Sequence, residues 1–200
     1  MTQFKLNRKK PVVYFGRITE AKGVKLIIQV MHTLYKEEYS NLSPLWIIGG
    51  NYSEIKKLKE QIDILTIIQE MESNNLLFWW GHVPHDILPH LLTRCSVFCF
   101  ASLYEPGGRT ILEAMACGLP VIATPQGFAP EIINEGVNGF IVNDNSIEKW
   151  KEKICFLLTN EEAALEMGSA ARMTIKNNFT MNHFFSQHWD IYQQFQPRIK

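Results

Sequence analysis

SVFCFASLYEPGGRTILEAMACGLPVIAT, residues 96–124, places two short apolar runs on either side of an amphipathic segment. The runs at 96–101 and 120–124 have the length and the aromatic or β-branched content of buried strands. The segment between them follows a pair of glycines and is rich in the small and aliphatic residues of a helix. A strand, a helix and a strand in this order predict parallel pairing in an α/β sheet.

The same alternation extends along most of the chain. Further strands are predicted at 11–16, 44–50, 76–81 and 139–142, and helices at 22–39, at 53–71 and in shorter stretches after Pro84 and Gly108. Because the strands are apolar on both faces, we predict a three-layer, doubly wound, Rossmann-like parallel sheet in one domain, residues 11–200. After residue 143 only helical patterns follow, at 146–159, 161–177 and 180–195, which predicts a helical C-terminal tail (146–195) capped by Asn145 or Ser146.

Composition excludes several functional classes. The 20 basic and 20 acidic side chains cancel, so the chain is not expected to bind nucleic acid or other polyanions in general. A basic cluster at the start predicts a solvated tail or interdomain linker over residues 1–10, with weak membrane-surface contact as the alternative: Lys5, Arg8, Lys9 and Lys10.

Cysteine use and hydropathy point to the cytoplasm. The four cysteines form no Cys-x-x-Cys pair and lie in apolar stretches, so we interpret them as core thiols in a reducing compartment: Cys95, Cys99, Cys117 and Cys155. No apolar run resembles a signal peptide or a membrane span. We therefore expect a cytoplasmic protein, with a peripheral position at the inner membrane face as the alternative.

Ligands of such sheets bind at the loops that follow the strands. The first loop, GRITEAKG (16–23), is neither a dinucleotide fingerprint nor a Walker loop. It carries Arg17 and Lys22 instead, two cations that are able to clamp a diphosphate. Taken alone, the pair is also compatible with ordinary surface cations at a helix start.

The loop after the fourth strand carries the stronger signal. Gly107 and Gly108 allow close approach of a ligand, and the helix from about residue 109 offers free N–H groups to an anion. Glu105 and Glu113 would flank a diphosphate bound there, and carboxylates accept hydrogen bonds from hydroxyls. This arrangement suits a nucleoside diphosphate sugar. The alternative is that Glu105 caps the helix and Glu113 is solvated.

At this point the sequence resembles a known family. EPGGRTILEAMACGLPVIATPQGFAPEIINEGVNGFIV (105–142) is similar to the donor-binding segment of retaining glycosyltransferases of the family 4 type, which have the GT-B fold. Three further segments resemble the same family in the same order: YFGRITEAKGVKLIIQVM (14–31), PLWIIGG (44–50) and LLFWWGHVPHDILPHLLTRCSVFCFAS (76–102). The likeness covers about residues 11–195, the C-terminal half of such an enzyme, so this chain resembles one half of a GT-B fold.

The resemblance implies a role for each matching residue. Glu105 would be the catalytic residue that meets the transferred sugar, Glu113 would hold the ribose, and the backbone around His82 and Val83 would contact the base. The donor diphosphate would meet Gly16, Arg17, Lys22, Gly107, Gly108, Arg109 and Thr110. The donor would be a UDP- or GDP-linked sugar, with no cofactor and no metal. The closely spaced His82, His85 and His90 match no metal-ligand pattern and are interpreted as surface or capping residues.

Two departures from the family occur. Gly107 stands where phenylalanine is common, and Phe128 stands where a second glycine is usual. The Phe128 ring is expected to pack, with a narrower sugar pocket as the alternative. Aromatic residues of the last predicted helix are also expected to pack, rather than to stack on a base: Phe184, Phe185, Trp189 and Tyr192.

Nothing in the sequence resembles the N-terminal GT-B domain, which supplies much of the acceptor pocket in the family. We therefore expect that domain to act in cis or as a separate chain, and the 200-residue chain to be inactive alone. The hypothesis is the donor-binding half of a retaining hexosyltransferase with an unidentified acceptor. The alternatives are a non-catalytic sugar-nucleotide-binding subunit and a GT-B sugar-nucleotide epimerase.

Overall fold

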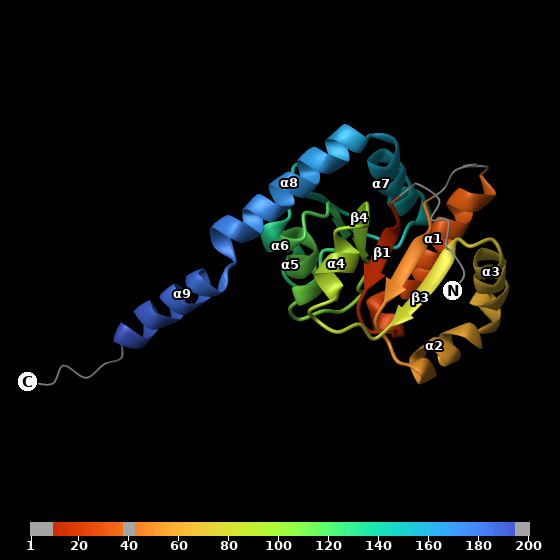
Figure 1. Ribbon diagram of the computed structural model, residues 1–200, viewed down its shortest axis with the longest axis horizontal. Helices are drawn as coiled ribbons and strands as arrows, with labels where there is room; N and C mark the ends of the chain where they lie inside the picture. The colour runs from red at the N-terminus through yellow and green to blue at the C-terminus, as the bar shows by residue number, and fades with distance from the viewer. Residues whose placement is uncertain (1–9, 38–42, 195–200) are drawn as a thin grey trace, which may run out of the picture.

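The computed structural model describes residues 10–37 and 43–194, which form an α/β domain followed by a projecting helix (Figure 1). Its centre is a sheet of six parallel strands in the order β3-β2-β1-β4-β5-β6. The strands are β1 (Val12–Phe15), β2 (Leu45–Ile48), β3 (Leu77–Gly81), β4 (Val97–Phe100), β5 (Val121–Ala123) and β6 (Gly139–Ile141). This order is that of a doubly wound, Rossmann-like sheet, as predicted.

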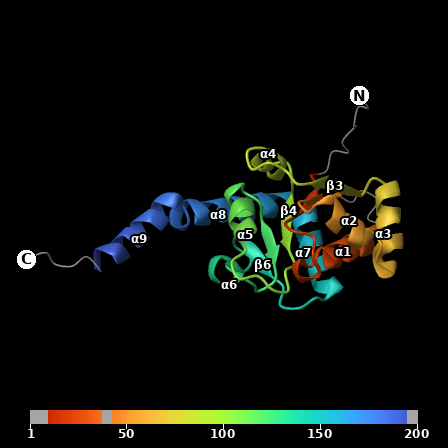
Figure 2. The same ribbon diagram turned by 90° about the horizontal axis from the view of Figure 1, so that it is seen from below.

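Alternate residues of each strand enter two separate cores. In β1, Val12 and Tyr14 pack on one side of the sheet, whereas Val13 packs on the other. The first side is covered by α1 (Val24–Lys36), α2 (Tyr52–Lys59), α3 (Ile62–Ser73) and α7 (Ile147–Thr159). The second is covered by α4 (Leu88–Leu92), α5 (Arg109–Ala116), α6 (Ala129–Ile132) and the second half of α8 (Glu161–Asn178) (Figure 2). Helices therefore cover both faces, which explains why the strands carry no polar alternation.

One predicted helix is wrong. The segment 53–71 forms two helices, because the chain becomes extended at Gln61. The buried residues explain the break: Leu58 of α2 is followed by Ile64 of α3, and this spacing does not keep both on one face of a continuous helix. The new start turns Ile64 and Ile68 toward the sheet and leaves Ile62 exposed. The predicted tail helices are confirmed, and Ser146 is the cap of α7.

The last helix, α9 (Met181–Gln194), extends away from the domain in both views (Figures 1 and 2). The aromatic residues that were expected to pack are more than half exposed in this chain: Phe184, Phe185, Trp189 and Tyr192. The expected packing is therefore absent within the described residues. Lys10 of the basic cluster is exposed, and the other three cations lie outside the described residues. Among the helices of the described ranges, none is long and apolar enough to cross a membrane.

The loop after β1 is packed tightly against the end of β4. It contains a short 3-10 helix, η1 (Glu20–Lys22), and then Gly23, whose φ is 68°. A Cβ on Gly23 would lie only 1.9 Å from the carbonyl oxygen of Ala101, just beyond β4. Leu103 also donates a backbone hydrogen bond of 2.8 Å to the Ala21 carbonyl. Glycine at residue 23 thus lets the two loops touch.

This contact predicts a difference between two glycine substitutions. Gly136 also has a positive φ, 74°, but no atom lies within 4 Å of its hypothetical Cβ. Gly136→Ala should therefore cost only the left-handed backbone strain, roughly 1–2 kcal/mol. Gly23→Ala should cost about 2 kcal/mol more, because the loops must also separate. Urea unfolding of both variants tests this, and equal losses would mean that the two loops do not depend on their contact.

Candidate donor-binding site

The site lies where the strand order reverses, between β1 and β4. The carboxyl ends of these neighbouring strands release two loops on the same edge of the sheet, residues 16–23 and 101–108. A cavity of about 300 Å³ opens there, lined by both loops and by the start of α5. Crevices at such reversal points are where open α/β sheets bind ligands.

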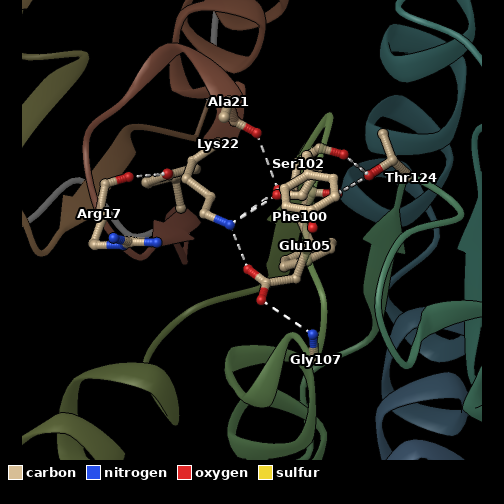
Figure 3. Close-up of polar contacts among 10 residues, drawn as sticks. Arg17, Ala21, Lys22, Phe100, Ser102, Glu105, Gly107 and Thr124 are labelled. Carbon is tan, nitrogen blue, oxygen red and sulfur yellow. Dashed lines mark hydrogen bonds and ion pairs between the residues drawn. The ribbon is translucent and has the colours of Figure 1, made fainter.

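Lys22 and Glu105 both line the cavity and form an ion pair (Figure 3). The Lys22 Nζ donates to Glu105 Oε2 at 2.6 Å and to the Tyr104 carbonyl at 2.9 Å. The other carboxylate oxygen, Oε1, accepts from the Gly107 backbone N–H at 3.2 Å. Both oxygens of Glu105 are thus held by the two loops that line the cavity.

These contacts keep Glu105 ionised. Burial acts to raise the pKa of Glu105, but the hydrogen bonds from Lys22 and from the Gly107 and Gly108 amides outweigh it and lower the pKa. The two side chains are only 12% and 19% exposed, so the pair is less screened by water than a surface ion pair. A fixed, ionised carboxylate in this cavity is suited to accept hydrogen bonds from hydroxyl groups.

The second carboxylate that lines the cavity is Glu113, on the second turn of α5. Burial raises the pKa of Glu113, and the charges of His85 and Arg109 lower it by a smaller amount. Between the two carboxylates α5 begins at Gly108, whose φ is 85°, and no side chain caps the helix. Its first N–H groups therefore have no partner within the helix and are able to bind an anion.

The first loop is held by Tyr14, whose hydroxyl donates to the Arg17 carbonyl at 2.6 Å. Burial raises the pKa of Tyr14, so this hydroxyl remains a donor. The Arg17 side chain is exposed and lines the same cavity as Lys22. The two cations predicted from the first loop therefore face the same space as the start of α5.

Most of the residues predicted as a site come together. The cavity is lined by Gly16, Arg17, Lys22, Glu105, Gly108, Arg109, Thr110 and Glu113. Gly107 does not line it but holds Glu105 through its N–H. His82 and Val83 are also outside the lining, and their predicted contact with a base remains a prediction.

The sequence reasoning missed six lining residues, of which three carry an oxygen or nitrogen atom in the side chain: Tyr14, His85 and Ser102. Tyr14 precedes the loop inside a strand, where apolar packing was the natural interpretation. His85 was interpreted as a surface residue, and it is exposed, but it lines the cavity and its charge acts on Glu113. His85 lies in the loop between β3 and α4, which has no regular period, so its spacing gave no signal.

The two departures from the family pattern are neighbours in space. A Cβ on Gly107 would lie 3.6 Å from the Phe128 ring, and Phe128 donates its backbone N–H to the Gly107 carbonyl at 2.7 Å. Phe128 also packs against the core between the sheet and α5. The ring thus packs as expected, beside the position where the family commonly has phenylalanine.

A larger cavity, of about 750 Å³, lies behind the first loop, between α1, α2 and the start of α7. Its charged lining residues are of both signs, Glu20 and Glu54 with Lys25 and Lys57. We assign the site to the smaller cavity, because that one lies where the strand order reverses between β1 and β4 and contains the Lys22–Glu105 ion pair. Among the described residues no group of three or more His, Cys, Asp or Glu side chains is arranged to hold a metal ion.

Residues 2–174 match the family model described as glycosyl transferases group 1. The chain belongs to this family. Two relatives are spore coat protein SA of Bacillus subtilis, 30% identical over 94% of this chain and 50% of that protein, and the alpha-maltose-1-phosphate synthase of Mycolicibacterium smegmatis, 26% identical over 97% and 50%. The chain therefore spans about half the length of these curated relatives.

Glycosyltransferases of known structure share the fold of this chain. Anabaena HepE, crystallised in complex with UDP, superposes with a TM-score of 0.80 over 94% of this chain and 49% of that one, at 23% identity. A glycosyltransferase from Rickettsia africae superposes with a TM-score of 0.77 over 92% and 47%, at 26% identity. The structural neighbours are GT-B glycosyltransferases, and the predicted fold class is confirmed.

The burial of Glu113 has a consequence for stability. Because the pKa is higher in the folded than in the unfolded chain, folding disfavours the ionised form, and stability is lost as the pH rises through the folded-state pKa. The neutral variant Glu113→Gln should thus be more stable than the wild type near pH 7 but not below about pH 4, where Glu113 is protonated in both states. Thermal unfolding at both pH values measures this. The exposed Glu131 of α6 provides the control, since Glu131→Gln should show no such difference.

Proposed function

We propose that the chain is the donor-binding half of a retaining glycosyltransferase of the family 4 type, which takes its sugar from a nucleoside diphosphate sugar. The observation that carries the proposal is the cavity itself, in which an uncapped helix start lies between Glu105 and Glu113, with Arg17 and Lys22 opposite. The diphosphate would bind at the helix start and the cations, where the developing charge of the leaving group is stabilised. Glu105 would meet the transferred sugar and Glu113 the ribose.

The nature of the donor is supported by the solved relatives. HepE has been crystallised with UDP and with UDP-glucose. We therefore favour a UDP-linked sugar over a GDP-linked one for this chain, and we propose that neither cofactor nor metal takes part. The base would lie near His82 and Val83. Retention of the anomeric configuration is inferred from the resemblance of residues 105–142 to the retaining family.

The chain matches only about half of each of these relatives, which affects the activity expected of it. Since the chain spans about half of them, we propose that an N-terminal domain, in cis or as a separate chain, supplies the acceptor pocket. Positioning the acceptor contributes about 7–11 kcal/mol to reactions of this kind. Residues 1–200 alone should then bind donor without measurable transfer.

Calorimetric titration with UDP, GDP and ADP tests the proposal directly. A single site with a dissociation constant of about 10 µM to 1 mM is expected for UDP, because no second domain closes over the ligand. Absence of heat with all three nucleotides at millimolar concentration would rule out a nucleotide-sugar site in this cavity.

Removal of Glu113 and removal of Glu105 should have different effects on ligand binding. Glu113→Ala should weaken UDP binding about tenfold, since it removes the acceptor for the ribose hydroxyls. Glu105→Ala should change UDP affinity by less than about twofold and weaken only the intact UDP-sugar. Titration of both variants with UDP and with UDP-glucose measures this. Equal losses of UDP affinity would contradict the assignment of the two ends.

His85 should also contribute to binding, because it lies beside Glu113 where the ribose is proposed to sit. His85→Ala is expected to weaken UDP binding by roughly threefold to tenfold, the size of one hydrogen bond. His90→Ala is a matched control from the same segment, because its side chain is exposed outside the cavity. An unchanged affinity in His85→Ala, or equal losses in both variants, would exclude this role.

A further inference from the structure

The ammonium group of Lys22 lies among three oxygen acceptors in this structure. It carries three N–H donors, and it has three acceptors: Glu105 Oε2 at 2.6 Å, the Tyr104 carbonyl at 2.9 Å and Ser102 Oγ at 3.5 Å (Figure 3). Two of these acceptors are neutral atoms of the loop after β4. They set the direction from which Lys22 approaches the Glu105 carboxylate.

Ser102 stands at the centre of this arrangement and is only 1% exposed. Its hydroxyl lies 3.1 Å from the Ala21 carbonyl and 3.0 Å from the Tyr104 carbonyl. One hydroxyl thus connects the residue before Lys22 with the residue before Glu105, across a separation of 81 positions between Ser102 and Ala21.

The backbone of Ser102 is held from a third strand. Its carbonyl accepts a hydrogen bond of 2.6 Å from the Thr124 hydroxyl, just after β5. Thr124 also lies 3.3 Å from the Phe100 carbonyl, and it makes no contact with Lys22 among the described hydrogen bonds. Thr124 therefore stabilises the same region without touching the ion pair, which makes it a matched control.

We propose that Ser102 is a positioning residue of the donor site, which fixes Lys22 against Glu105 and so holds the carboxylate in place for the hydroxyls of the transferred sugar. The identity of the ligand in this inference rests on the proposed function. The contacts of Ser102 with Lys22, Ala21 and Tyr104 are independent of it. Ser102 acts through Lys22, since its own hydroxyl is occupied and almost fully buried. Removing that hydroxyl leaves Tyr104 and Glu105 as acceptors for Lys22 and frees the ammonium group to move.

The first test measures the carboxyl group of Glu105 without any ligand. Carbon-13 NMR titration of glutamate side chains, with the Glu105 signal assigned from Glu105→Gln, should give a pKa below the ordinary value in the wild type. Ser102→Ala should bring the pKa of Glu105 back toward that value, whereas Thr124→Val should leave it unchanged. Lys22→Met is the second variant, and it should raise the pKa at least as much as Ser102→Ala does.

The second test compares ligands. Ser102→Ala should weaken UDP-glucose binding about fivefold to tenfold relative to free UDP, because Glu105 meets only the sugar, and Thr124→Val should leave that ratio unchanged. Thermal unfolding of both variants serves as the stability control. If the two lose stability equally, a change found only in Ser102→Ala does not come from general destabilisation. The proposal is overturned if Ser102→Ala leaves both the pKa and the ratio as in the wild type, or if Thr124→Val changes them equally. A wild-type chain that binds no nucleotide would instead refute the proposed function, and the NMR titration would still decide the role of Ser102.

Discussion

The parallel pairing of β1 with β4 is the constraint on which the site depends. Val12 and Val13 pair with Val97 and Phe98, so two strands far apart in sequence become neighbours at the middle of the sheet. Their loops then leave the same edge side by side, and the chain order reverses between them. The ion pair of Lys22 with Glu105, the contact of Gly23 with Ala101 and the cavity all follow from this one pairing.

The two carboxylates of the cavity lie in opposite environments. Glu105 has its charge compensated by Lys22 and by backbone amides, whereas Glu113 is desolvated with weaker compensation. The first therefore contributes to the stability of the loops, and the second lowers it. Such a cost is common at sites that must present an unpaired acceptor to a ligand, because a fully satisfied carboxylate has little left to offer.

The parallel sheet could be predicted from the sequence because each strand is a short, continuous apolar run. Such a run is buried on both faces, as strands are in a parallel sheet covered by helices on both sides. The sequence was also sufficient to bring Glu105, Glu113, Arg17 and Lys22 to one site, since the carboxyl ends of parallel strands share an edge. The break at Gln61 escaped prediction, because it depends on where the sheet lies beneath Leu58 and Ile64 rather than on any local signal.

The remaining features depend on tertiary contacts that have no sequence period. Ser102 resembles any loop serine until the Ala21 carbonyl, from a distant segment, is seen beside it. His85 becomes a cavity residue only through the path of the loop between β3 and α4. The role of Phe128 likewise depends on a partner, Gly107, that lies on a different loop. Sequence predicted which loops meet, but not which atoms meet within them.

The separation between the two loops has a consequence for how the molecule folds. Lys22 and Glu105 are 83 positions apart. The central strand β1 pairs with β2 and β4, so both edges of β1 are covered only after β4 has joined the sheet. During synthesis from the N-terminus, β1 and β2 therefore exist first as a partial sheet with one apolar edge exposed. Closing so long a loop is slow compared with forming helices. The ligand site and the centre of the sheet should thus appear in the same late step of folding.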